Sequence, residues 1–177
     1  MACILAEFRD ADIDRLVAWI SSPELLGQWA GSAFDFPFTR AQMQAHLGAT
    51  GGRGERYVFK ALHSESAEPV GHIELGAIDR AHGSARIGRV FVAPEHRGRG
   101  YGKQMTQHVL EIAFGRMRLH RVELSVFDFN VPAIACYERV GFQREGVRRD
   151  VYRRPDGFWS EILMSVLAPE LPSRPPH

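Results

Sequence analysis

The sequence has little of what marks secreted, membrane-bound or metal-binding proteins. Only two of its 177 residues are cysteines, Cys3 and Cys136, which are too few for a disulfide framework and lack the spacing of a metal site. No apolar run reaches the length of about 18 residues that a membrane span needs, and the N-terminus has no basic segment before an apolar stretch. These absences predict a cytoplasmic protein with free thiols, no bound metal and no membrane partner.

The chain also lacks an excess of either charge. Its 22 Lys and Arg residues and 21 Asp and Glu residues give a formal net charge of +1, which argues against a nucleic-acid partner. The two halves differ, because residues 1–80 hold 7 basic and 11 acidic residues whereas residues 81–177 hold 15 and 10. A basic second half suits a polyanionic cofactor and an acidic first half suits a cationic amine, although solvated surfaces give such asymmetry by chance as well.

The chain has no internal repeat and no linker long enough to separate two domains. Its length suits one domain, which at this size buries roughly 70% of the surface of the unfolded chain. We therefore expect a single domain over residues 1–167. The remaining residues, 168–177, include four prolines and are expected to form a flexible tail.

The hydrophobic pattern alternates between helical and extended spacing. We expect a first helix with Asp10 as its N-cap, a second beginning at Pro23, and an aromatic-rich loop over 29–38. Further helices are predicted over 39–47, 100–116 and 131–140, the last ended by Gly141. Strands are predicted over 4–8, 56–62, 69–79, 84–92, 121–126, 143–151 and 159–167. This order predicts an α+β fold with a mixed, mostly antiparallel sheet of about seven strands and helices on both faces.

A glycine-rich loop follows the strand predicted over 84–92. It reads Arg97-Gly98-Arg99-Gly100-Tyr101-Gly102-Lys103 and leads into a predicted helix. Glycines allow backbone N–H groups to converge, and a helix N-terminus adds partial positive charge. The loop therefore predicts a cradle for a pyrophosphate, although glycine loops of this kind also occur as simple turns.

A second motif lies about 30 residues downstream. It comprises Leu124-Ser125-Val126, then Asn130-x-x-Ala133-x-x-x-Tyr137, then Gly141-Phe142. Together with the R-x-x-G-x-G pattern of the loop, it resembles the GNAT superfamily of N-acetyltransferases. The likeness covers roughly residues 69–167, and the chain looks most like the branch that contains ribosomal-protein N-terminal and small-amine acetyltransferases.

The resemblance implies a sheet whose fourth and fifth strands splay apart, so that the pantetheine arm of acetyl-CoA lies between them like an added strand. Gly88 is the expected site of the bulge that causes the splay. The implied acetyl-CoA-binding residues are Val90, Phe91 and Val92 for pantetheine, Arg97, Gly98, Arg99, Gly100, Tyr101, Gly102 and Lys103 for the pyrophosphate, and Asn130, Ala133 and Tyr137 on the following segment.

The implied reaction transfers an acetyl group to a primary amine, which attacks the thioester directly in a ternary complex. Tyr137 matches the family's general acid. Because the pKa of tyrosine is about 10 and that of a thiol about 8.5, we expect hydrogen bonding to the departing sulfur to be its larger role. A tyrosine packed in the core is the alternative interpretation.

The base that receives the amine proton is less clear. Where relatives carry glutamates, the fourth strand has Arg86 and Arg89 and the fifth has Ser125. Glu74 and Ser125 remain candidate catalytic residues, and Glu74 faces either the cleft or, as the sequence favours, water. The other candidates for the base are His72, Glu123 and Asp128.

The acceptor is left open between a protein N-terminus and a small amine such as a polyamine or an aminoglycoside. Candidate acceptor-binding residues are Trp29, Phe34, Phe36 and Glu74. The aromatic rings either stack on a cation or pack in the core. Because the strand glutamate is missing, the alternative function is a non-catalytic module that senses acyl-CoA. A homodimer is also compatible with the sequence.

Overall fold

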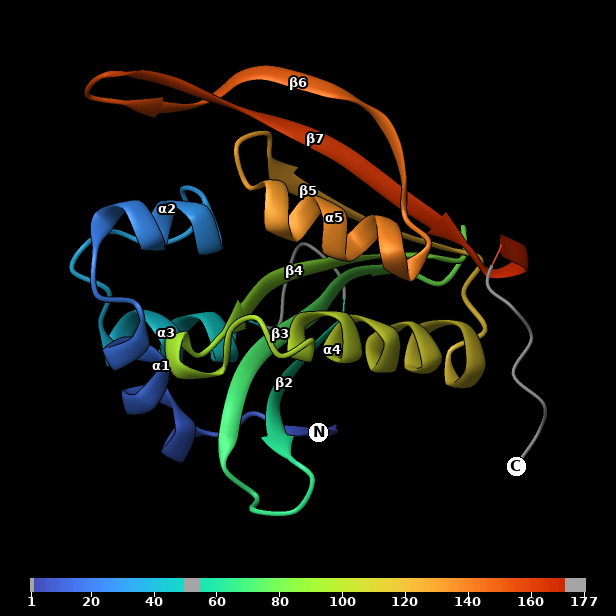
Figure 1. Ribbon diagram of the computed structural model, residues 1–177, viewed down its shortest axis with the longest axis horizontal. Helices are drawn as coiled ribbons and strands as arrows, with labels where there is room; N and C mark the ends of the chain where they lie inside the picture. The colour runs from blue at the N-terminus through green and yellow to red at the C-terminus, as the bar shows by residue number, and fades with distance from the viewer. Residues whose placement is uncertain (1, 50–54, 171–177) are drawn as a thin grey trace.

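The computed structural model describes residues 2–49 and 55–170, and its centre is a seven-stranded sheet (Figure 1). The strands are β1 (Cys3–Glu7), β2 (Glu55–His63), β3 (Pro69–Asp79), β4 (Ser84–Val92), β5 (Arg121–Phe127), β6 (Gln143–Arg154) and β7 (Gly157–Leu167). Their order is β1-β2-β3-β4-β5-β7-β6, and the one parallel pair among these strands is β4 with β5. This confirms the predicted α+β fold and its mixed sheet.

Helices cover both faces of the sheet. They are α1 (Ile13–Trp19), α2 (Pro23–Ala30), α3 (Arg40–Gly48), α4 (Tyr101–Leu110), which continues as a π-helical turn over Glu111–Arg116, and α5 (Val131–Val140). Ile73 and Leu75 of β3 pack in one apolar cluster with α4 and α5. Phe91 of β4 packs in a second cluster with α1, α2 and α3. Since side chains alternate along a strand, the two clusters lie on opposite faces.

Local sequence explains where the helices begin and end. Ser22 Oγ accepts the N–H of Leu25 at 3.1 Å and caps α2. Gly141, with φ +114°, ends α5 as predicted. The prediction for Asp10 is wrong: residues 10–12 form a short 3₁₀ helix, and Asp12 accepts the N–H of Arg9 at 2.9 Å instead. The loop predicted over 29–38 also begins too early, because α2 runs through Ala30.

Strands β4 and β5 pair only at their beginnings, from Ser84 opposite Arg121 to Arg86 opposite Glu123. Beyond this point the strands part, which confirms the predicted splay. Across β3 and β4, His72 lies opposite Phe91 but Glu74 opposite Gly88, so β4 carries an extra residue.

The bulge lies just beyond its predicted position. Gly88 keeps its place in the ladder with β3, and the left-handed conformation falls on Arg89, whose φ is +49°. A non-glycine residue in this conformation is strained and needs surrounding contacts to hold it. The contacts of Arg89 are therefore part of what shapes the splay.

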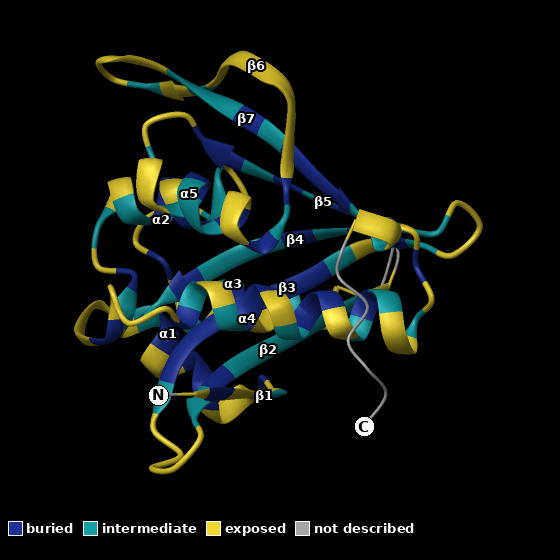
Figure 2. Cartoon of the chain, turned by 45° about the vertical axis from the view of Figure 1, so that its right-hand side comes forward, coloured by how far each residue is buried: buried dark blue, intermediate teal, exposed yellow. Residues whose placement is uncertain are grey.

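Burial separates the inner strands from the outer hairpin (Figure 2). Residues 70–75 of β3 are all buried, whereas most of β6 is exposed. The first residues of the predicted tail, Ala168–Glu170, form a 3₁₀ helix, in which Glu170 accepts the N–H of Leu167 at 2.8 Å. Residues 50–54 and 171–177 lie outside the described residues. Within 2–49 and 55–170, no helix has the length and apolar character to cross a membrane.

Candidate active site

A cavity of about 1030 Å³ opens where β4 and β5 part. It is lined on one side by the glycine-rich loop, the start of α4 and α5, and on the other by α2. Because α5 and α2 belong to opposite faces of the sheet, the cavity passes through the sheet. It brings together most of the predicted site residues: Trp29, Val90, Phe91, Val92, Arg97, Gly98, Gly100, Tyr101, Gly102, Lys103, Ser125, Asn130, Ala133 and Tyr137.

The glycine-rich loop forms its end of the cavity mainly with backbone. Gly98 and Gly100 have φ +74° and +82°, and Gly100 is the N-cap of α4 without any side chain that caps the helix. The first N–H groups of a helix have no partner within it, so those of α4 are available to an anion. Gly102 lies against Cys136 and Val92, and a Cβ there would make ordinary contacts of 3.7 Å with Cys136 Sγ and Val92 Cγ2.

The basic residues of the loop differ in position. Lys103 lines the cavity, whereas the exposed Arg99 does not belong to the described residues of its lining. Arg97 also lines it, but its Nε donates to the carbonyl of Val92 at 3.2 Å and its Cζ lies 5.4 Å from the centre of the Phe91 ring. Arg97 therefore holds the loop against the end of β4.

Tyr137 projects from α5 and lines the cavity, with 8% of its surface exposed. Its ring also packs in the apolar cluster between α4, α5 and the sheet. Burial raises the pKa of Tyr137 above its usual value, with a smaller contribution from Cys136. The phenol therefore stays protonated and is a hydrogen-bond donor at neutral pH.

The segment before Tyr137 is set by Asn130. Its Oδ1 accepts the N–H of Ala133 at 3.3 Å, which caps α5. Cys136 also lines the cavity, and burial raises the pKa of its thiol, with opposing effects from Arg139 and Lys103. A thiol that is held protonated is a weak nucleophile.

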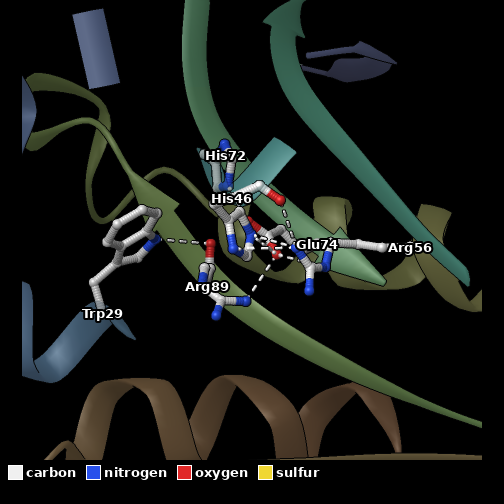
Figure 3. A network of polar contacts seen from close by, with 6 residues as sticks. All are labelled: Trp29, His46, Arg56, His72, Glu74 and Arg89. Atoms are coloured by element: carbon white, nitrogen blue, oxygen red, sulfur yellow. Dashed lines mark hydrogen bonds and ion pairs between the residues drawn. The ribbon is translucent and has the colours of Figure 1, made fainter. Parts of the chain in front are cut away.

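Glu74 lies in a buried network rather than in water (Figure 3). It is 2% exposed and does not belong to the described lining of the cavity. Its carboxylate accepts from Arg89 Nη1 at 2.8 Å and contacts His46 Nε2 at 3.0 Å and His72 Nε2 at 3.3 Å. The expectation that Glu74 faces water is wrong because α3 covers this face of the sheet and brings His46 over the carboxylate.

The network also decides what Glu74 can do chemically. Burial alone would raise its pKa, but the hydrogen bonds from His46 and His72 and the charge of Arg89 outweigh burial and lower the pKa well below its usual value. A carboxylate this strongly stabilised is a poor proton acceptor. His46 is absent from the sequence-based candidates, because nothing in its helical neighbourhood signals a partner 28 residues away.

The other predicted base, Ser125, is paired with arginine. Arg86 Nη2 donates to Ser125 Oγ at 2.5 Å, and its Nη1 donates to Glu123 at 3.3 Å. Glu123 also accepts from Arg121 at 3.2 Å. The point at which β4 and β5 part is thus occupied by paired charges.

The aromatic residues around α2 mainly pack with one another. The ring of Trp29 stacks on Phe34 at 5.7 Å between centroids, and its Nε1 donates to the carbonyl of Arg89 at 2.9 Å. Trp29 lines the cavity, whereas Phe34 and Phe36 are not among the described residues that do. At the tip of the β6–β7 hairpin, Arg154 pairs with Glu24 of α2 at 2.9 Å and ties the hairpin to this side.

Known proteins share both sequence and fold with this chain. The model of the acetyltransferase (GNAT) family matches residues 23–142. An uncharacterized N-acetyltransferase, p20, of Bacillus licheniformis is 27% identical over 161 residues, which are 91% of this chain and 88% of that protein. The spermidine N(1)-acetyltransferase of Vibrio cholerae is 35% identical over 77 residues, 44% of each chain.

Among solved structures, the spermidine N-acetyltransferase from Vibrio cholerae in complex with CoA and spermine superposes with a TM-score of 0.83 at 20% sequence identity. The superposition covers 95% of this chain and 96% of that one. At this identity the likeness shows a shared fold.

Proposed function

Because the chain belongs to the GNAT family of acetyltransferases and is an acyltransferase, we propose that it transfers the acetyl group of acetyl-CoA to a small primary amine. The amine attacks the thioester directly while both substrates are bound. The observation that carries this proposal is the cavity through the sheet, which is lined by the glycine-rich loop on one side, by α2 on the other and by Tyr137.

Acetyl-CoA suits the residues on the side of the glycine-rich loop. The uncapped N-terminus of α4 and the positive-φ glycines Gly98 and Gly100 offer N–H groups to the pyrophosphate, and Lys103 adds a full charge. Hydrogen bonds to charged groups contribute about 1.5–3 kcal/mol each. Beyond Arg86, β4 no longer pairs with β5, so the backbone of Val90, Phe91 and Val92 has no strand partner on that side and is proposed to pair with the pantetheine amides. The Val92 carbonyl already accepts from Arg97.

Asn130 and Ala133, at the start of α5, line the same groove and complete the proposed contacts to the cofactor arm. Arg99, exposed at the edge of the loop, adds long-range attraction to the phosphates rather than a contact.

Tyr137 is the proposed catalytic residue. Its protonated phenol donates a hydrogen bond to the sulfur as the carbon–sulfur bond breaks. The thiolate then takes a proton from solvent or from the acceptor nitrogen, which becomes positively charged once the neutral amine has bonded to the carbonyl carbon. A backbone N–H of the Val90–Val92 segment polarises the thioester carbonyl, as oxyanion-hole donors do.

Neither Glu74 nor Ser125 serves as the base in this proposal, since both are paired with arginine. The amine loses its proton to water before or during binding. For an α-amine with a pKa of about 7.7–8.0 this costs about 1 kcal/mol at neutral pH, and for a lysine-like amine of about 10.4 it costs about 4–5 kcal/mol.

A small amine is favoured over a protein N-terminus because of the relatives. Proteins named spermidine and spermine N(1)-acetyltransferases match parts of this chain at 32–35% identity.

Residues 1–167 are proposed to form the catalytic domain, and the residues after 170 are proposed to be a tail that the reaction does not require.

The test is release of free thiol from acetyl-CoA with a panel of amines and an N-terminal peptide, with Tyr137→Phe beside the natural chain. Turnover of a small amine, reduced by the substitution, supports the proposal. If acetyl-CoA binds but no amine releases thiol and Tyr137→Phe binds it equally well, the chain is an acyl-CoA sensor instead.

A further inference from the structure

The cavity is strongly unbalanced in charge. Among the described residues that line it, five are Arg or Lys and only one, Glu161, is a carboxylate. Arg97, Lys103 and Arg139 belong to the loop and to α5, where the proposed function puts the phosphates of acetyl-CoA. Arg86 and Arg89 belong to β4, and their charges are not accounted for by that cofactor.

Arg89 is held in place by contacts at both ends. Its Nη1 donates to Glu74 at 2.8 Å, its carbonyl accepts from Trp29 at 2.9 Å, and its guanidinium carbon lies 5.6 Å from the centre of the Phe34 ring. Figure 3 shows the contacts with Glu74 and with Trp29 on either side of the residue. The guanidinium is therefore positioned before any ligand arrives.

One donor of this guanidinium is left over. The Nε of Arg89 is buried and has no hydrogen-bond partner among the described residues. Buried donors in folded proteins nearly always have partners, and Arg89 lines the cavity, so this donor is available to a ligand that binds there. Nε and one terminal nitrogen of a guanidinium form a planar fork that matches the two oxygens of a carboxylate.

Arg86 adds a second positive charge to the side of the cavity that Arg89 lines. It lies on β4 where the strand parts from β5, and it pairs with Ser125 and with the half-exposed Glu123. The lone carboxylate of the lining, Glu161, is paired with Arg148 at 3.3 Å. A polyamine bound here would bring further positive charges to Arg86 and Arg89 with no unpaired carboxylate of the lining to meet them.

We propose that Arg89, with Arg86 beside it on β4, forms a subsite for a carboxylate of the acceptor, so that the amine belongs to an amino-acid-like molecule rather than to a polyamine. This inference rests on the proposed function, since it assigns the acceptor of the same site. Glu74 is then a positioning residue, which holds Arg89 so that its free edge faces the acceptor.

The first experiment compares amines with and without a carboxylate. Thiol release is measured for the full chain with glycine, β-alanine and γ-aminobutyrate, each beside its carboxamide, and with spermidine. We expect kcat/KM of the best acid to exceed that of its amide at least tenfold and spermidine to be the poorest substrate. Equal rates for acid and amide, or a preference for spermidine, overturn the subsite.

A binding measurement separates this inference from the proposed function. Calorimetry in the presence of CoA compares the N-acetyl derivative of each acid with that of its amide. Tighter binding of the acid derivative without any turnover retains the subsite and overturns the proposed function. Equal binding overturns the subsite even if amines are acetylated.

Variants then assign the residues. Arg86→Gln and Arg89→Gln are each expected to reduce the preference for acid over amide about 10-fold or more, since hydrogen bonds between charged groups contribute about 1.5–3 kcal/mol. Arg86→Glu should shift the preference toward spermidine. Because Arg89→Gln also removes a partner of buried Glu74, the two Arg86 variants test the subsite even if that protein does not fold.

The matched control is Arg149→Gln, an exposed arginine on β6 outside the described lining of the cavity. It should leave the preference unchanged. An equal loss of preference in this variant, or an unchanged preference in both Arg86 variants, overturns the assignment to β4.

Discussion

The two ends of the cavity are built in opposite ways. The end beside α4 consists of consecutive residues whose backbone does the work: two glycines at positive φ and a helix N-terminus without a capping side chain. The end beside α2 is lined by the side chains of Trp29 of α2 and Arg89 of β4. Arg89 is held from behind the lining by buried Glu74 of β3, which contacts His46 of α3. One end depends on chain conformation and the other on partners.

This difference bears on how each end can change. A backbone cradle binds any pyrophosphate group whatever side chains surround it, so it needs little beyond its glycines. A buried network of charged side chains is altered by any one of its members, because the others are then left without a partner. The end beside α2 is therefore the one at which acceptor specificity can diverge.

The largest effect is expected at the backbone end. Gly100→Glu introduces a carboxylate at φ +82° beside the N-terminus of α4. The loss of two or three charged hydrogen bonds, at about 1.5–3 kcal/mol each, weakens acetyl-CoA binding by at least about 100-fold in calorimetry. Gly115→Glu, in the turn after α4 with open space around it, is the matched control. Unchanged affinity in Gly100→Glu would contradict the cradle.

At the side-chain end, the main expected effect of a substitution is a loss of folding stability. Glu74→Gln leaves Arg89 without its buried counter-charge, and breaking such a pair lowers the free energy of unfolding by about 3–5 kcal/mol. Glu123→Gln, whose carboxylate is half-exposed, should lower it by about 1 kcal/mol or less in the same urea titration. Equal losses in the two variants would mean that the network contributes no more than a surface pair.

The same variant gives a pH dependence with a defined sign. The pKa of Glu74 is lowered in the folded chain, so its contribution is fully present above the pKa of an unfolded glutamate, about 4.3, and is lost as the pH falls below it. The stability difference between the natural chain and Glu74→Gln should therefore shrink as the pH falls below about 4. A constant difference between pH 7 and pH 3 would argue against a charged Glu74.

Tyr137 lines the cavity between the proposed binding sites of acetyl-CoA and of the acceptor, so its substitution tests whether the two substrates react there. Tyr137→Phe removes the donor to the departing sulfur and is expected to lower kcat about 100-fold while the KM for acetyl-CoA changes less than about threefold. Because burial raises the pKa of this phenol, kcat should show no loss from its ionisation near pH 10. Tyr57→Phe, whose hydroxyl pairs with Glu55 on β2, is the control. An unchanged kcat in Tyr137→Phe would remove the phenol from the reaction.

What the sequence predicts well follows the same division. The sheet and the loop of α4 depend on local patterns: alternating apolar residues, glycines at turns and a helix end at Gly141. These patterns are contiguous in the chain and can be recognised without its three-dimensional structure. The splay of β4 and β5 is expected from the resemblance to the family. Even the bulge is predicted to within one residue, and it falls on Arg89 because two distant contacts compensate for the strain that glycine would avoid.

The errors lie where distant residues meet. Glu74 has the alternation of a strand with one wet face, but α3 covers that face, and His46 lies 28 residues away in the chain. Asp10 has the residue type of an N-cap, yet its carboxylate pairs with Arg40. In each case the propensity of a residue is overridden by a tertiary partner that no local pattern announces.

The smallest effect is expected for a substitution at Trp29, which alters a contact of the bulge but leaves the charged side chains of the network in place. Trp29→Phe keeps a ring in the aromatic cluster but removes the hydrogen bond from Nε1 to the carbonyl of Arg89. We expect unfolding to require about 1 kcal/mol less and the KM for the acceptor to rise a few-fold, with the affinity for acetyl-CoA unchanged. Trp19→Phe is the control, because Trp19 stacks on Phe91 but is not itself among the described residues that line the cavity. This variant should leave the KM for the acceptor unchanged. If Trp29→Phe weakens the binding of acetyl-CoA as much as the binding of the acceptor, the bulge shapes both ends of the cavity. The division between a backbone end and a side-chain end then does not hold at β4.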